Sequence, residues 1–73
     1  MSKHFQYLVE GITSDIICFY LEEHQDAEAT TAINDFYQSQ TFLKLTQEET
    51  GLFIESSSFV YELYLEELKY GRL

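Results

Sequence analysis

The residues that could carry out chemistry are two histidines, one cysteine and thirteen acids in a chain of 73 residues. His4 and His24 do not form the His-x-x-x-His pair that holds zinc on one face of a helix. His24 comes near the end of a predicted helix, where an imidazole interacts favourably with the last backbone carbonyls. We therefore expect no metal site, and we expect His24 to be a surface residue.

Cys18 is the single cysteine, so no disulfide can form within the chain. A reactive cysteine needs a nearby cation or a helix N-terminus to stabilise its thiolate. Cys18 lies instead between Ile17 and Phe19 on an apolar strip, and its charged neighbours are acids. We expect it to be a small buried hydrophobic residue rather than a nucleophile.

The acids include three adjacent pairs, Glu22-Glu23, Glu48-Glu49 and Glu66-Glu67, which raises the question of two-carboxylate catalysis. Adjacent residues on a helix point about 100° apart, so a pair cannot face one substrate, and we interpret the pairs as solvated faces. The sequence also contains no glycine-rich phosphate loop and no nucleophile elbow. We predict that the chain is not an enzyme and has no catalytic residue, no cofactor and no metal.

The formal net charge is −9, because 13 acids outnumber four basic residues. The basic residues are Lys3, Lys44, Lys69 and Arg72. They lie mostly near the two ends of the chain and form no basic stripe, so direct nucleic-acid binding is not expected. The negative charge also disfavours an anionic membrane surface, and the longest apolar run, Ile16 to Leu21, is too short to span a bilayer. The first ten residues do not resemble a signal peptide, so we expect a cytoplasmic protein.

Apolar residues recur at steps of three and four in three stretches, which predicts three main helices in one domain spanning residues 1–73. The predicted helices run from about Lys3 to His24, from an N-cap at Asp26 to near Ser39, and from Ser57 to about Tyr70, with Ser2 capping the first and Gly71 closing the last. The glycine inside the first helix, Gly11, predicts either a bend or a neighbouring helix that crosses closely.

The connection before the last helix is harder to interpret. Thr41 to Leu45 is either one more turn or an extended link, and Leu52 to Ile54 is a link that inserts side chains into the core. Thr46 to Glu49 matches a capping box and predicts a single helical turn, with Gly51 in the left-handed position that ends it. The expected fold class is all-α: a compact bundle or orthogonal array of three main helices plus one short helical turn.

The C-terminal half of the chain resembles a group of small acidic uncharacterised bacterial proteins. The segments that carry the resemblance are Phe36 to Phe42, Lys44-Leu45, Glu49 to Leu52, Glu55-Ser56, Val60 to Leu63 and Glu66 to Leu68. Such proteins are loosely associated with toxin–antitoxin-type or mobile-element gene clusters. The resemblance implies an all-helical accessory or antitoxin-like protein, and it implies no site residue.

The function that we expect is protein–protein interaction, antitoxin-like or regulatory, with a more basic protein partner. The last helix combines aromatic and acidic residues, and its candidate partner-binding residues are Tyr61, Glu62, Tyr64, Glu66, Glu67 and Tyr70. For its tyrosines, core packing with the hydroxyls at the rim and an exposed recognition surface both remain open. Two alternative functions are a DNA mimic that inhibits a nucleic-acid-binding protein and a purely structural homo-oligomer.

A homodimer is also expected, because the first and last helices carry more apolar surface than a core of this size can bury. Its candidate interface residues are Phe19, Leu21, Phe59 and Leu65.

Overall fold

The computed structural model describes residues 2–71, and these residues form four α-helices and two 3₁₀ turns without any strand. The elements in chain order are α1 (Lys3–Glu23), α2 (Ala29–Tyr37), α3 (Gln40–Leu45), η1 (Glu48–Thr50), η2 (Leu52–Ile54) and α4 (Ser57–Tyr70). The predicted all-α class is confirmed, and the three longest helices are the three that were predicted. Arg72, one of the four basic residues of the sequence, lies outside the described residues.

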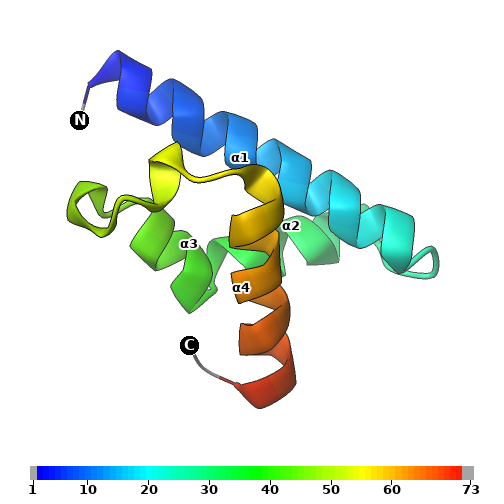
Figure 1. Cartoon of the computed structure of the whole chain (residues 1–73). Coiled ribbons are helices and arrows are strands. Elements are labelled where there is room, and N and C mark those ends of the chain that lie inside the picture. Colours follow the sequence, from blue (N-terminus) through cyan, green and yellow to red (C-terminus); the bar gives the residue numbers. More distant parts are fainter. Residues whose placement is uncertain (1, 72–73) are drawn as a thin grey trace.

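The helices form an array in which α1 lies along one side of the molecule (Figure 1). Helix α4 begins beside the middle of α1 and runs away from it at a steep angle (Figure 1). Helices α2 and α3 lie on the same side of α1 as α4 (Figure 1). A hydrogen bond fixes the crossing, because the Ser57 hydroxyl at the start of α4 donates to Asp15 Oδ2 at 2.6 Å. The arrangement therefore corresponds to the orthogonal form of the predicted architecture.

The core is built on one stripe of α1, where Phe5, Val9, Ile12 and Ile16 recur at helical spacing and are all buried. The other elements supply the remaining core side chains, which are Phe36, Leu45, Leu52, Val60, Tyr61 and Tyr64. Aromatic rings join the layers: Phe5 meets Phe53 edge-to-face at 4.7 Å between ring centroids. Of the elements after α1, α2, α3, η2 and α4 each contribute a side chain that packs in the core, and η1 does not.

Serine hydroxyls cap three of the four α-helices. Ser2, Ser39 and Ser56 each accept a hydrogen bond from a backbone N–H three residues further on, at 3.0–3.1 Å. The predicted cap at Asp26 is wrong. The Ala27 N–H donates to the His24 carbonyl at 2.9 Å, so residues 24–27 form a turn, and α2 begins only at Ala29.

The segment between α2 and α4 also differs from its prediction in detail. Thr41 to Leu45 belongs to a helix, α3, and Thr46 ends that helix by donating its hydroxyl to the Leu43 carbonyl, so it does not begin a capping box. Gly51 adopts the predicted left-handed conformation, with φ of 72°. Leu52 is buried, as expected of a link that inserts side chains into the core, while Ile54 is exposed.

Helix α1 continues through Gly11 without a break. A Cβ placed on this glycine would meet no atom of the described residues within 4 Å, so the predicted close crossing of a neighbouring helix is wrong. Within the same described range, no helix is both long enough and apolar enough to cross a membrane.

Candidate functional site

The tyrosines of the last helix divide between the core and the surface. Tyr61 and Tyr64 are 7% and 3% exposed, whereas Tyr70 is 65% exposed. The Tyr64 ring packs edge-to-face against Phe36 at 5.0 Å, and burial, followed by the charge of Asp35, raises the pKa of its phenol to about 12. Tyr64 is therefore a core residue and not a partner-binding one, since its ring is unavailable to another protein.

The Tyr61 hydroxyl donates to Glu23 Oε1 at 2.5 Å. Burial raises the pKa of this phenol above its usual value, and the hydrogen bond to Glu23 raises it further. The phenol stays protonated and ties α4 to the end of α1. Of the two alternatives for the tyrosines of this helix, Tyr61 follows core packing with the hydroxyl at the rim. Only a small part of its side chain is left for a partner to contact.

Glu67 has a structural role as well. Its carboxylate accepts the backbone N–H groups of Gln40 and Thr41 at 2.8 and 2.9 Å and the Thr41 hydroxyl at 2.8 Å. Burial of Glu67 would raise the pKa of this carboxyl, but the three hydrogen bonds outweigh it and hold the pKa below its usual value. The interpretation of Glu67 as a solvated partner-binding acid is therefore wrong.

The predicted partner-binding residues that remain available are Glu62, Glu66 and Tyr70, all of them exposed. Glu62 lines a hollow of about 470 Å³ between α1 and α4, which we call the α1–α4 hollow. Its lining residues are Phe19, Glu22, Glu23, Ser58, Tyr61, Glu62 and Leu65. The Phe19 and Tyr61 rings form its aromatic part and meet edge-to-face at 5.4 Å.

Two of the four predicted dimer-interface residues, Phe19 and Leu65, lie in this hollow and are partly buried. Phe59 is 45% exposed outside it, and the partly buried Leu21 does not line it. The structure therefore brings Phe19 and Leu65 together with Glu62 and the acidic end of α1, and it leaves Leu21 and Phe59 apart from them.

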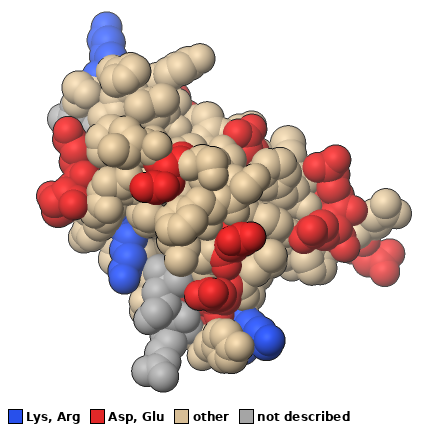
Figure 2. Space-filling model, viewed as in Figure 1, with Lys and Arg blue, Asp and Glu red and all other residues tan. Residues whose placement is uncertain are grey.

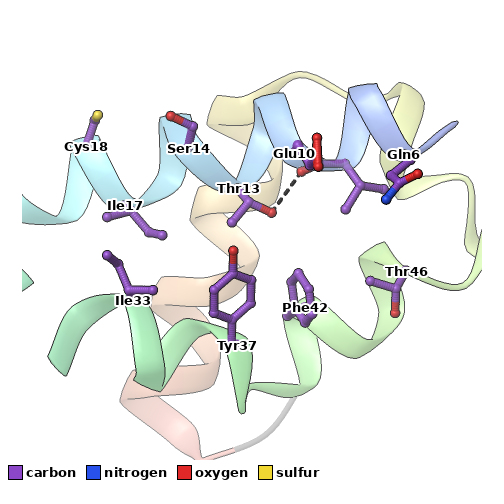
Figure 3. Close-up of a pocket in the computed structure, with 11 residues that line it drawn as sticks. Gln6, Glu10, Thr13, Ser14, Ile17, Cys18, Ile33, Tyr37, Phe42 and Thr46 are labelled. Carbon is purple, nitrogen blue, oxygen red and sulfur yellow. Dashed lines mark hydrogen bonds between the residues drawn. The ribbon is translucent and has the colours of Figure 1, made fainter. Parts of the chain in front are cut away.

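A second concave surface was not predicted from the sequence. It is a groove of about 490 Å³ between α1 and the α2–α3 pair, which we call the α1–α2 groove (Figure 3). Its lining residues are Gln6, Val9, Glu10, Thr13, Ser14, Ile17, Cys18, Ile33, Tyr37, Phe42 and Thr46.

The prediction that Cys18 is buried is wrong, because its side chain is exposed at the edge of this groove. Ile33 and Tyr37 on α2 are 38% and 52% exposed. The buried residues of α2 are Ala32 and Phe36, so Ile33 and Tyr37 lie beside the buried face. The signal that could have revealed them is the width of the apolar face of α2.

The buried polar atoms and the possible metal ligands of the described residues bear on the predictions for His24 and for a metal site. Within residues 2–71, every buried side-chain nitrogen or oxygen has a hydrogen-bond partner, and no three histidine, cysteine or acidic residues gather into a possible metal site. His24 is an exposed residue whose Nδ1 lies 3.0 Å from the Tyr20 carbonyl, in the surface role that was expected.

Comparisons of the chain with protein-family models, with curated proteins and with solved structures found no match. The geometry and charge of the two concave surfaces are therefore the basis for a function.

Proposed function

We propose that the chain is a small acidic protein-interaction module that binds a more basic protein, and that this partner contacts the α1–α4 hollow. One observation carries the proposal. The hollow joins three carboxylates, those of Glu22, Glu23 and Glu62, to an aromatic and aliphatic wall, and none of the described residues that line it is basic. Among described surfaces, this is where the predicted acidic and apolar candidate residues coincide.

The chemistry of the hollow suits an arginine side chain. A guanidinium group can donate two parallel hydrogen bonds to a carboxylate such as Glu62, and its flat face can stack on the Phe19 ring. The bond from Tyr61 to Glu23 Oε1 fixes that carboxylate in place, so less side-chain freedom is lost when a partner binds.

The charge of the whole chain supports the same kind of partner. Carboxylates gather near the end of α1 and along α4, with few basic side chains between them (Figure 2). A net charge of −9 accelerates association with a basic surface and disfavours nucleic acid as a competing ligand. The resemblance to antitoxin-like bacterial proteins makes a basic protein encoded nearby the natural first partner to test.

The test starts with capture of partners from the source cells on the immobilised chain, followed by mass spectrometry. The affinity of the captured protein is then measured for two double variants, Glu62→Lys with Glu66→Lys and, as the matched control, Asp35→Lys with Glu55→Lys. All four acids are exposed, both variants change the net charge by the same amount, and neither Asp35 nor Glu55 is among the described lining residues of the hollow or of the α1–α2 groove. We expect the first to lose tenfold or more in affinity and the control to lose less than threefold, because it loses only long-range attraction.

Equal losses for the two double variants would contradict the proposed site, and a captured partner with no basic surface would contradict the proposed function. Displacement of the partner by duplex DNA would favour the DNA-mimic alternative. Light scattering of the free chain tests the homodimer, for which a mass of 8.6 kDa would count against a dimer through Phe19 and Leu65.

A further inference from the structure

We propose that the α1–α2 groove is a second binding surface, and that it takes one amphipathic helix of a basic protein. The inference rests on the proposed function only for the basic character of the partner. The groove itself lies between other elements than the α1–α4 hollow, and the two share no lining residue.

The shape of the groove is that of a helix-sized channel. Seven of its lining residues follow one stripe of α1 from Gln6 to Cys18, a distance of about 18 Å or three helical turns. Ile17, Ile33, Tyr37 and Phe42 lie between the helices, and the Tyr37 ring extends from α2 towards α1 (Figure 3). An occupant that presents apolar residues at i, i+3, i+4 and i+7 would match this length and this lining.

The walls favour a helical occupant over an extended one. All three walls are α-helices, whose backbone groups along the groove are already paired within each helix. An extended peptide would therefore face apolar side chains with its own N–H and C=O groups unpaired, at a cost for each buried group. A helix satisfies its backbone internally and avoids that cost.

The exposure of the groove favours a macromolecule over a small ligand. Ile33 and Tyr37 are 38% and 52% exposed, so one side of the groove is open to water. Sites for small molecules usually bury most of the ligand surface, which an open channel cannot do. A second copy of the chain, with 13 acids and four basic residues, offers Glu10 little complementary charge, and the expected homodimer uses Phe19 and Leu65 of the α1–α4 hollow instead.

Charge complementarity defines the polar side of the occupant. Among the described residues that line the groove, Glu10 is the only acid and none is basic. Further acids follow at the two ends: Glu48 and Glu49 come just after Thr46, and Asp26 and Glu28 lie in the connection between α1 and α2. Lysine or arginine residues on the flanks of the bound helix would therefore be attracted to Glu10 and to the acids near both ends of the groove.

The probe for the test is a peptide of about 14 leucines and lysines with the leucines on one helical face. A scrambled peptide of the same composition, with the leucines dispersed, is the control for charge. The protein variants are Ser14→Trp, which fills the groove, and Ser58→Trp, which fills the α1–α4 hollow. Both serines are exposed and line their respective surfaces, and the charge is unchanged in both variants.

The expected result for the amphipathic peptide is at least tenfold weaker binding to Ser14→Trp, with binding to Ser58→Trp within twofold of the parent chain. Amide shifts in ¹⁵N spectra are expected at Ser14, Cys18 and Ile33. Equal affinity for the two peptides, or unchanged affinity of Ser14→Trp, would overturn the inference. These outcomes leave the proposed function standing, because that function is tested by Glu62 and Glu66, which lie outside the groove.

Discussion

The carboxylates of Asp15, Glu23 and Glu67 hold α4 against the rest of the chain. Asp15 accepts from Ser57, Glu23 accepts from Tyr61, and Glu67 accepts from the first turn of α3. In each case an ionised acceptor meets a neutral donor from another element, which is stronger than a bond between two neutral groups. All three acids stabilise the fold, and Glu23 is the one that also lines the α1–α4 hollow among the described residues.

Replacement of Gly11 by alanine is expected to stabilise the folded chain. It lies inside α1 with no described atom within 4 Å of its added Cβ, so an alanine meets no steric obstacle there. Gly11→Ala is expected to raise the free energy of unfolding by about 1 kcal/mol, because alanine loses less backbone entropy in a helix. Thermal melting followed by circular dichroism should show a midpoint roughly 4–8 °C higher.

The matched control is Gly51→Ala. Gly51 also has open space around it, but its φ of +72° lies in the left-handed region that side chains disfavour. This change is expected to lower the free energy of unfolding by about 1 kcal/mol. A lower melting midpoint for Gly11→Ala would mean that the backbone at residue 11 is not helical in solution.

Helix α3 depends on its neighbours more than the other helices do. Its six residues are far too few for a stable isolated helix in water. Two side chains compensate at its first turn. Ser39 caps the helix, and the Glu67 carboxylate accepts two further N–H groups and the hydroxyl of the fully buried Thr41. Glu67 on α4 therefore stabilises the first turn of α3.

Glu67→Gln is the direct test of this clamp. The amide removes the charge and turns one acceptor oxygen into a donor that faces a backbone N–H. We expect a loss of about 1–2 kcal/mol in the free energy of unfolding, measured by urea titration. Glu66→Gln is the control on the same helix, because Glu66 is exposed, and its effect is expected within about 0.5 kcal/mol. Similar losses for both variants would assign the effect to overall charge and exclude a specific clamp.

The long helices were predictable because apolar residues recur at steps of three and four within each of them. The stripe from Phe5 to Ile16 and the Ser2 cap are local features, and periodicity with capping identifies them. The clamp on α3 was not predictable, since Glu67 and Thr41 lie 26 residues apart and only the fold brings them together. The same holds for the α1–α2 groove. Single-helix patterns indicate which side chains are apolar, but the angle between helices decides whether Ile33 and Tyr37 are covered.

The molecule is about as compact as its length predicts, with a Cα radius of gyration of 11.7 Å against about 11 Å expected for a chain of this size. The conformational entropy lost on folding costs such a chain nearly as much free energy as the burial of its single small core contributes. The polar ties to α4 and any bound partner therefore make a larger relative difference to stability here than in a larger domain. This links the two concave surfaces to the stability of the whole chain, because a ligand that binds only the folded state raises its melting temperature.

The last prediction concerns the pH range over which the whole molecule is stable. The folded state lowers the pKa of Glu67 below its usual 4.5, so the stability that this carboxylate contributes is present above that pH and is lost as the pH falls through the lowered value. The opposite sign applies to Tyr61 and Tyr64, whose usual pKa is 10.0 and whose folded-state values are raised. Their contribution is complete below pH 10 and is lost as the pH rises through the folded-state values, which for Tyr64 is about 12.

Melting measured by circular dichroism from pH 3 to 12 should therefore show a plateau, with decreases below about pH 4.5 and above about pH 10. Tyrosinate absorbance of the two core tyrosines, Tyr61 and Tyr64, should appear in the same samples together with unfolding. Glu67→Gln removes the titrating carboxylate of the clamp. The difference in melting temperature between this variant and the parent chain should therefore shrink below about pH 4.5 and persist above about pH 10. A melting temperature that peaks near the isoelectric point of 4.3 would contradict this account, because it would mean that relief of charge repulsion outweighs the clamp.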